Sequence, residues 1–505
     1  MNFVPGVWYV RILPEIVLTV FGALILLVEG PARAGNRGRL CGALALLGSL
    51  AAFAACFVQA RYPGEAFSGL FRVDRLAIYF HFLIVLATLV VVLLAMDYLR
   101  AQHYERGEFY ALVLFAAVGM GFMVGSVELV MIFIGLEISS ISSYILAGYR
   151  RNAPRSTEAA LKYLLLGSFA TAFFLYGIAL IYGGTGSTMI DAIARGVAGK
   201  ISMGGLTGAS LIPAAAGLMF VGLAFKVSAV PFQVWTPDVY EGAPAPVTGL
   251  LATAPKAAAF VVFLRVFYVA LNSYSHDWFW LVWTASLLSM TAGNLAALLQ
   301  NNIKRMLAYS SIAHAGYVLV AFAALAVNPT VLQSVSGPAA LLPGHGVAAI
   351  LFYLAAYVAM NLGAFAVIAH FAHRNERYVE LNDYAGLGFR FPFASAALAL
   401  FLLSLIGVPL TAGFFGKLYV FRAALDAHLV GLVIVALLNS ALAAFYYLRV
   451  IVYMYMRPSG QEVPAPAPSG AFRLVMAICI IAVLWLGIFP ETILGFAHAA
   501  AYHLR

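Results

Sequence analysis

The residues best suited to chemistry in this 505-residue chain are charged side chains placed inside long apolar runs. One acid and seven basic residues occupy such positions: Glu137, Lys162, Lys226, Lys256, Arg265, Lys417, Arg422 and Arg449. A charge at the depth of a lipid bilayer costs at least about 3 kcal/mol on insertion scales. Such a residue therefore faces a protein interior or water, and it marks a pathway by default.

Lysine and glutamate together suit proton transfer. A lysine that is withdrawn from water holds its proton less tightly, and a nearby carboxylate restores the proton affinity. A change in the influence of Glu137 would therefore load or release a proton. Ser140 and Tyr144 follow on the same helix face, where their hydroxyls can carry bridging water or serve only in packing. His314, in the middle of an apolar run, is either a satisfied core residue or a relay, and the lysines favour a relay.

Three of the lysines lie beside residues that interrupt a helix. Pro231 follows Lys226 by five residues, Pro255 directly precedes Lys256, and a stretch rich in glycine and proline precedes Lys417. Irregular backbone at membrane depth is tolerated only where it is buried or lines a wet cavity. Interrupted spans in two halves of a chain are typical of transporters with a site near the membrane midplane. We therefore expect these lysines to line a proton path.

The arginines in apolar runs favour a different interpretation. Arg265, Arg422 and Arg449 lie near the ends of those runs, where a long side chain can reach the lipid headgroups. We expect them to have structural roles.

The composition requires a membrane. The chain is 64% hydrophobic and 10% charged, with a mean hydropathy of +0.96, whereas a soluble domain carries roughly 25% charged residues. A spanning helix needs about 20 apolar residues, and about fourteen runs qualify. Their approximate limits are 11–29, 39–59, 76–97, 109–126, 128–149, 157–182, 211–236, 246–271, 277–300, 303–325, 345–372, 392–425, 427–456 and 470–490. The predicted fold is an all-α polytopic membrane protein.

The two clearly interrupted spans lie five spans apart, which predicts a five-span unit repeated in inverted orientation with discontinuous helices. The expected organisation is an N-terminal three-helix segment, two five-helix repeats, and a tether with a C-terminal helix, at 1–108, 109–271, 272–457 and 458–505.

The net charge of +9 does not indicate nucleic acid, because the basic residues lie in short loops. With both termini outside, most of these residues fall in cytoplasmic loops, as the positive-inside rule requires. That set is Arg33, Arg37, Arg39, Arg100, Arg106, Arg150, Arg151, Arg155, Lys304, Arg305, Arg374, Arg377, Arg390, Arg457 and Arg473.

No cofactor site is expected in this chain. Cys41, Cys56 and Cys479 are scattered without metal-ligand spacing, and no glycine loop suited to phosphate appears. The loops are too short to hold a soluble catalytic domain. If the protein serves a redox reaction, the electrons move elsewhere.

Three stretches resemble the antiporter-like membrane subunits of respiratory complex I. They are KVSAVPFQVWTPDVYEGAPAPVT at 226–248, NNIKRMLAYSSIAHAGY at 301–317 and SLIGVPLTAGFFGKLYVF at 404–421. Two segments favour the subunit N branch over the larger subunits L and M: the N-terminal stretch LPEIVLTVFGALILLVEG and the motif WTPDVYEGAP. The similarity covers essentially the whole chain.

The resemblance implies a fold with fourteen helices, inverted repeats and two discontinuous helices. It also implies roles by position in a proton path, in the order of helices five, six, seven, eight, ten and twelve: Glu137, Lys162, Lys226, Lys256, His314 and Lys417. One position departs from the pattern. Many relatives carry histidine where this chain has Gln233, and glutamine cannot titrate, which puts proton uptake through that position in doubt.

The resemblance further implies a membrane-arm subunit of a proton-translocating NADH–quinone oxidoreductase in the bacterial inner membrane. Protons would pass from the cytoplasm through Lys226, Lys256 and His314 to Lys417, driven by neighbouring subunits. NADH, flavin, iron–sulfur clusters and quinone would belong to those partners. Two alternatives remain open: a cation/proton antiporter subunit that works without redox chemistry, and a structural membrane subunit with vestigial charges.

Overall fold

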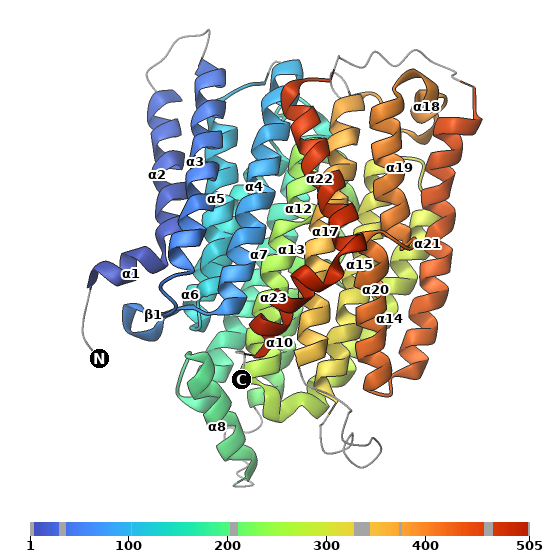
Figure 1. The fold of residues 1–505 in the computed structure, drawn as a ribbon. Helices are drawn as coiled ribbons and strands as arrows, with labels where there is room; N and C mark the ends of the chain where they lie inside the picture. Colours follow the sequence, from blue (N-terminus) through green and yellow to red (C-terminus); the bar gives the residue numbers. More distant parts are fainter. Residues whose placement is uncertain are drawn as a thin grey trace.

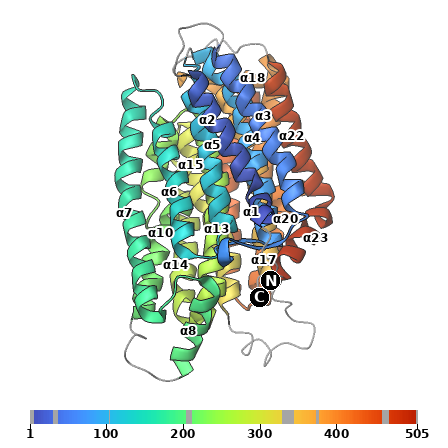
Figure 2. The ribbon, with the colours of Figure 1, turned by 90° about the vertical axis from the view of Figure 1, so that its left-hand side faces the viewer.

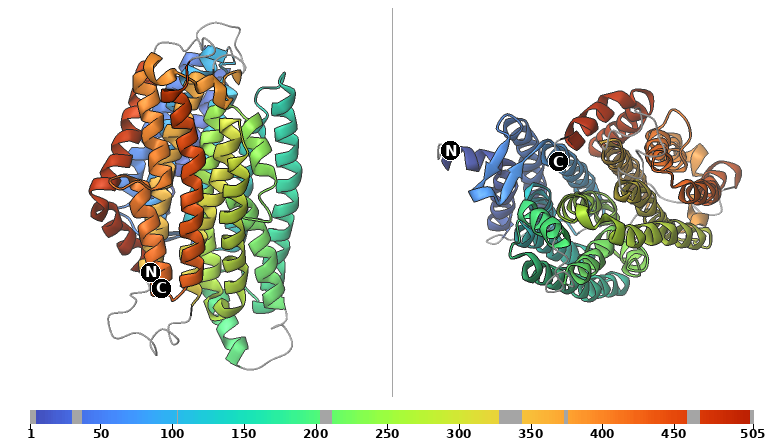
Figure 3. Two further views of the ribbon diagram at one scale, coloured as in Figure 1. Left: turned by 90° about the vertical axis from the view of Figure 1, so that its right-hand side faces the viewer. Right: turned by 90° about the horizontal axis from the view of Figure 1, so that it is seen from below.

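The computed structural model describes residues 5–29, 37–102, 104–202, 211–327, 344–372, 376–458 and 468–502. These residues form one elongated helical bundle, whose helices run side by side and are mostly seen end-on from below (Figures 1 and 3). The helix α18 lies at one end of the bundle and α8 at the other (Figure 1). We call these the α18 end and the α8 end.

The N-terminal part holds α1 (Pro5–Arg11), α2 (Leu13–Glu29), α3 (Arg37–Gln59) and α4 (Arg75–Gln102). A short antiparallel hairpin of β1 (Gly64–Ala66) and β2 (Phe71–Val73) separates α3 from α4. The sequence predicted no strand here. The hairpin forms outside the apolar runs, and its residue Phe71 packs edge-on against Phe122, at the end of a neighbouring helix.

The next part carries three long helices, α5 (Gly107–Gly125), α6 (Leu129–Ala147) and α7 (Pro154–Thr185), and the short α8 (Ile190–Ser202). It continues with α10 (Leu211–Val227), α11 (Trp235–Gly242), α12 (Ala245–Ala252), α13 (Ala254–Phe263) and a π-helical turn, η2 (Leu264–Ala270). The helix α7 runs along one edge of the bundle, packed against α6 and α10 (Figure 2).

The last part holds α14 (Ser275–Leu298), α15 (Ile303–Ala326), α17 (Gly344–Phe371), α18 (Leu387–Arg390), α19 (Pro392–Ile406), α20 (Ala412–Asp426), α21 (Val430–Met456), α22 (Gly470–Ile488) and α23 (Pro490–Tyr502). In the described part of the chain, eleven helical segments are long and apolar enough to cross a membrane, and α10 and α19 are shorter apolar helices. The all-α membrane fold is confirmed.

The three predicted helix interruptions are present. The helix α10 ends at Val227, Ser228 follows in a left-handed conformation with φ +64°, and Pro231 cannot donate to the carbonyl of Val227. Thr253 separates α12 from α13 with φ −121° and ψ −85°. Gly407 ends α19 with φ +96°, a left-handed conformation that favours glycine.

Side chains bind the carbonyl groups that two of these breaks release. The indole of Trp235 donates to the carbonyl of Phe225 at 3.1 Å. The ammonium of Lys417 donates to the carbonyls of Leu405 and Ile406 at 3.1 and 2.8 Å. Because freed carbonyls in an apolar interior must find donors, a lysine beside a break serves the fold as well as any transport.

Candidate proton path

Lys226 lies in the last turn of α10 in an aromatic enclosure. Its side-chain nitrogen is 5.9 Å from the ring centroids of both Tyr144 and Tyr163. The residue is only 4% exposed, and its nitrogen has no direct hydrogen-bond partner among the described residues. The rings of Tyr163 and Trp235 stack at 4.4 Å and cover this enclosure.

Glu137 lies on α6, two turns before Tyr144, whose ring faces the nitrogen of Lys226. The carboxylate is half-buried, and one of its oxygens has no hydrogen-bond partner in the described part of the chain. Ser140 donates to the carbonyl of Leu136 within its own helix, whereas the buried hydroxyl of Tyr144 is unpaired there. Of the two hydroxyls on this face, Tyr144 is thus the one free to bind water.

Lys256 lies in the first turn of α13, directly after the second break. It is 2% exposed, and its nitrogen donates to the hydroxyl of Ser311 at 2.5 Å. The same nitrogen is 5.9 Å from the ring centroid of Tyr240. Ser311 belongs to α15, so this contact joins the central broken helix to the helix that carries the next site residue.

His314 lies one turn further along α15 and is held by two tyrosines. Its Nδ1 is 2.6 Å from the hydroxyl of Tyr353, and its Nε2 is 3.2 Å from that of Tyr447. Tyr447 also exchanges a hydrogen bond with Ser310. A histidine whose two nitrogens both face hydroxyls can pass a proton by exchanging donor and acceptor roles.

Lys417 lies on α20 just after the third break. Besides the two carbonyls of α19, its nitrogen donates to the hydroxyl of Ser440 at 2.8 Å and is 5.0 Å from the ring centroid of Tyr317. All of these partners are neutral. Lys417 thus differs from Lys226, which has a carboxylate in its neighbourhood.

Further buried polar groups lie on the elements between the lysines. Those without a hydrogen-bond partner among the described residues are Gln233, Thr236, Tyr240, Tyr357 and Asn361. Buried polar groups normally bind protein or ordered water. Their amides and hydroxyls therefore suit a hydrated route between α10 and α15.

Lys162 is placed differently from the other lysines. It is 41% exposed on α7 and pairs with Glu158 and Asp238, each at 2.7 Å. Asp238 in turn bonds Arg305 at 2.7 Å, and Arg305 also bonds Glu241 at 3.0 Å. Partial burial pushes the pKa of Asp238 up, but its hydrogen bonds to Lys162 and Arg305 outweigh this and hold the pKa below its ordinary value.

Of the three arginines in apolar runs, Arg265 and Arg449 make structural contacts. Arg265 pairs with Asp74 at 3.0 Å and donates to the carbonyl of Val124 at 2.8 Å. Arg449 donates to the carbonyls of Leu298 and Gln300 at the end of α14. Arg422 is exposed on α20.

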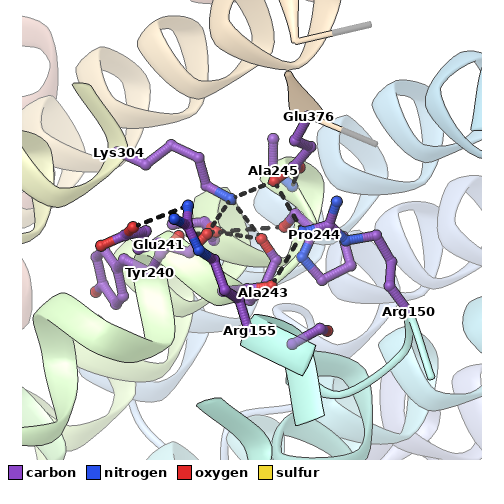
Figure 4. A network of polar contacts seen from close by, with 12 residues as sticks. Arg150, Arg155, Tyr240, Glu241, Ala243, Pro244, Ala245, Lys304 and Glu376 are labelled. Carbon is purple, nitrogen blue, oxygen red and sulfur yellow. Dashed lines mark hydrogen bonds and ion pairs between the residues drawn. The ribbon is translucent and has the colours of Figure 1, made fainter. Parts of the chain in front are cut away.

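A buried cluster at the α18 end, which we call the Glu376 clasp, was not predicted from the sequence (Figure 4). The carboxylate of Glu376 accepts hydrogen bonds from Tyr98, the backbone of Ala245 and Lys304, at 2.7, 2.7 and 2.6 Å, and lies 3.4 Å from Arg150. Lys304 also donates to the carbonyls of Ala243 and Glu241. These contacts fix the turn between α11 and α12.

The clasp shows that two basic residues assigned to the cytoplasmic loops are buried. Lys304 is 0% exposed in the first turn of α15, and Arg150, in the connection between α6 and α7, is 6% exposed. The available signal was weak: Glu376 stands alone between Arg374 and Arg377 in an otherwise basic stretch. The neighbouring arginines would explain an acid at this position, and the sequence does not show that its partners lie far away in the chain.

A second buried acid–base pair joins α2 to α4 outside the predicted path. Nε2 of His81 lies 2.5 Å from a carboxylate oxygen of Glu15, and both residues are 2% exposed. Nδ1 of His81 lies 2.6 Å from the carbonyl of Ala77. Because a carbonyl can only accept, Nδ1 carries hydrogen, and the contact with Glu15 is made through Nε2.

An all-α bundle with interrupted helices and lysines beside the breaks defines the class of antiporter-like membrane proteins. Residues 126–443 match the family described as NADH:quinone oxidoreductase/Mrp antiporter, transmembrane, and the chain belongs to this family.

The curated relatives of this chain point to one particular subunit within the family. The chain is 49% identical to NADH-quinone oxidoreductase subunit N 2 of Koribacter versatilis, covering 99% of this chain and 98% of that protein. It is 42% identical to NADH-quinone oxidoreductase subunit N of Trichlorobacter lovleyi, over 97% and 96% of the two chains.

Solved structures have the same fold. A chain of respiratory complex I from Thermus thermophilus superposes with a TM-score of 0.77 at 34% identity, over 95% of this chain and 98% of that one. A chain of the Mrp complex from Dietzia superposes with a TM-score of 0.79 at 22% identity, over 97% of both chains, and shows the fold alone.

Proposed function

We propose that this chain is a subunit N of a bacterial NADH–quinone oxidoreductase and carries protons across the inner membrane. The observation that carries the proposal is the placement of three buried lysines, Lys226, Lys256 and Lys417, each beside a helix break. Near-full-length identity to curated subunits of that name supports the assignment.

The path proposed for the proton follows the polar contacts. Lys226 receives it under the influence of Glu137, Lys256 takes it next, and Ser311 and His314 connect Lys256 to the second half. Lys417 then releases it at the opposite side. Charge on Glu137 stabilises the protonated form of Lys226, so a neighbour that moves or neutralises this charge would drive the proton onward.

The α18 end is proposed to face the cytoplasm, because the loops assigned to that side hold most of the basic residues. Both termini then lie on the other side. Electron transfer is assigned to partner subunits, which would hold flavin, iron–sulfur clusters and the quinone site.

The alternative of a redox-independent cation/proton antiporter rests on likeness of fold. The Mrp chain that superposes well is only 22% identical, whereas relatives named for the oxidoreductase reach 49%. These identities favour the oxidoreductase.

The test is Lys226→Ala in the assembled complex. We expect NADH-driven proton pumping by inside-out vesicles to fall strongly, because no other described amine occupies the enclosure beside Glu137. NADH–ferricyanide activity reports assembly, and Arg422→Ala, which removes an exposed charge on α20, is the matched control. Full pumping by an assembled Lys226→Ala complex would rule out the role of Lys226.

A further inference from the structure

Helices α7 and α11 meet beside Lys226 through two adjacent contacts. The rings of Tyr163 and Trp235 stack at 4.4 Å with an interplanar angle of 10°. The side chains of Lys162 and Asp238 form an ion pair at 2.7 Å. Lys162 directly precedes Tyr163, and Asp238 lies about one helical turn after Trp235, so the same two segments supply both contacts.

These contacts lie at the boundary between exposed and buried parts of the chain. The side chains of Lys162 and Asp238 are 41% and 31% exposed. Tyr163 and Trp235 are both 2% exposed. The ring of Tyr163 faces the nitrogen of Lys226, and Trp235 bonds the carbonyl of the preceding residue, Phe225. The ring stack thus lies between the buried Lys226 and the partly exposed ion pair.

The ion pair can open without leaving a charge unpaired. Lys162 keeps Glu158, one turn away on α7, also at 2.7 Å. Asp238 keeps Arg305 of α15, bound at 2.7 Å through its other oxygen. An exposed ion pair contributes little to stability, and here each partner retains an equivalent one.

The far end of α11 has no such freedom. Lys304 holds the carbonyls of Glu241 and Ala243, and Glu376 holds the backbone of Ala245 (Figure 4). Breaking a buried, fully bonded ion pair is far more costly than breaking an exposed one. The weak contact is therefore the one at the Trp235 end, next to Lys226.

We propose that Lys162 and Asp238 act as a latch, and Tyr163 and Trp235 as a lid, that together control access from the α18 end to Lys226. This inference rests on the proposed function and assigns four positioning residues to it. Such a latch would control proton uptake without a titratable side chain at position 233, where this chain has glutamine.

The experiment measures access directly. Lys226→Cys is introduced into the complex, and modification by a small water-soluble thiol reagent is followed in inside-out vesicles. The chain without this substitution gives the background, since the native cysteines Cys41, Cys56 and Cys479 are all buried. Adding Asp238→Asn, which removes the ion pairs to both Lys162 and Arg305, should raise the modification rate at least about two- to fivefold, the range expected for loss of an exposed ion pair. Trp235→Leu should raise the rate as well.

The matched control is Glu158→Gln. It removes an ion pair of the same length from the same lysine, but that pair lies within α7 and does not join α7 to α11. A latch predicts faster modification with Asp238→Asn and an unchanged rate with Glu158→Gln. The latch would be overturned if Lys226→Cys were modified at the same rate alone, with Asp238→Asn and with Glu158→Gln. Equal increases with Asp238→Asn and with Glu158→Gln would overturn it as well. If Asp238→Asn does not assemble, Lys162→Gln tests the contact from the α7 side.

The result is independent of the test of proton pumping. Modification reports access whether or not Lys226 carries protons. Full pumping by Lys226→Ala would remove the proton role and leave the latch, whereas unchanged modification would remove the latch and leave the proton path.

Discussion

At the scale of single residues, the chain contains buried charges of two kinds. Lys226 has no direct hydrogen-bond partner among the described residues and lies between aromatic rings. Lys304 has three acceptors, one of them a carboxylate. Lys417 also has three acceptors, but all of them are neutral. A carboxylate in direct hydrogen-bond contact holds a lysine in place and favours its charged form. Direct contact with a carboxylate therefore separates Lys304 from Lys226, Lys256 and Lys417 more clearly than burial does.

The clasp predicts acid sensitivity. Burial raises the pKa of Glu376, but Lys304 and Arg150 lower it more, so the pKa lies below its ordinary value. Stabilisation by the charged carboxylate is therefore fully present above about pH 4.5 and is lost as the pH falls through the depressed pKa. Glu376→Gln should lower the free energy of unfolding by about 3–5 kcal/mol at neutral pH. The variant should not lose further stability through this residue as the pH falls. Thermal unfolding of the purified complex between about pH 7 and pH 3 measures both effects.

The control for this prediction is Glu108→Gln. Glu108 pairs with Arg151 at 3.5 Å on the surface, where both side chains are exposed, so its removal should cost at most about 1 kcal/mol. Equal losses for the two variants would mean that the clasp does not stabilise the fold.

The sequence reveals buried lysines but not their partners. Lys226, Lys256 and Lys417 stand out because each interrupts an apolar run beside proline or glycine. Glu376 does not, because it lies outside the spans, and its partner Tyr98 is 278 residues away. The pairing of Glu15 with His81 is hidden for the same reason: both lie near the starts of their helices, where a polar residue is unexceptional.

At the scale of elements, the proposed function depends on the helix breaks, and the proline and glycine residues near them predict where they fall. Pro231 accounts for the end of α10, and Gly407 for the end of α19. The two five-helix repeats stay a prediction. In their favour, α6 and α15 begin in the same way, with the side chains of Glu128 and Asn302 accepting a hydrogen bond from the third backbone nitrogen that follows.

Gly407→Ala should weaken the third break. A side chain at φ +96° is strained by about 1–3 kcal/mol, and the new methyl group would meet Cδ of Lys417 at 3.2 Å. We expect lower thermal stability and a displaced Lys417, seen as reduced pumping per NADH oxidised. Gly217→Ala, in α10 with nothing within 4 Å, is the control and should be neutral or slightly stabilising. If Gly407→Ala and Gly217→Ala had the same thermal stability and the same pumping, the left-handed turn at Gly407 would not position Lys417.

At the scale of the whole molecule, the proposed path depends on subunits outside this chain. The lysines, Glu137 and His314 can hold and pass a proton, but the proposal assigns electron transfer, and with it the source of energy, to partner subunits. A change in the position or charge of Glu137 is the step through which such a partner would act on Lys226. The chain should therefore be found in a stable assembly with redox proteins.

Purification of the tagged chain in mild detergent should recover flavin and iron–sulfur proteins together with NADH–quinone activity. The flavin and iron signals, measured by absorbance and electron paramagnetic resonance, are the readout, and an untagged strain is the control. Recovery with small membrane subunits alone, without redox groups, would favour the cation antiporter instead.

The Glu376 clasp also constrains how the chain is made. Its members lie at Tyr98, Arg150, Ala245, Lys304 and Glu376, and the carboxylate at its centre is translated last. Until Glu376 leaves the ribosome, Arg150 and Lys304 have entered the membrane region without their counter-charge. The turn between α11 and α12 should therefore become fixed only after Glu376 has been translated, a late step of biogenesis that precedes only the insertion of α19 to α23.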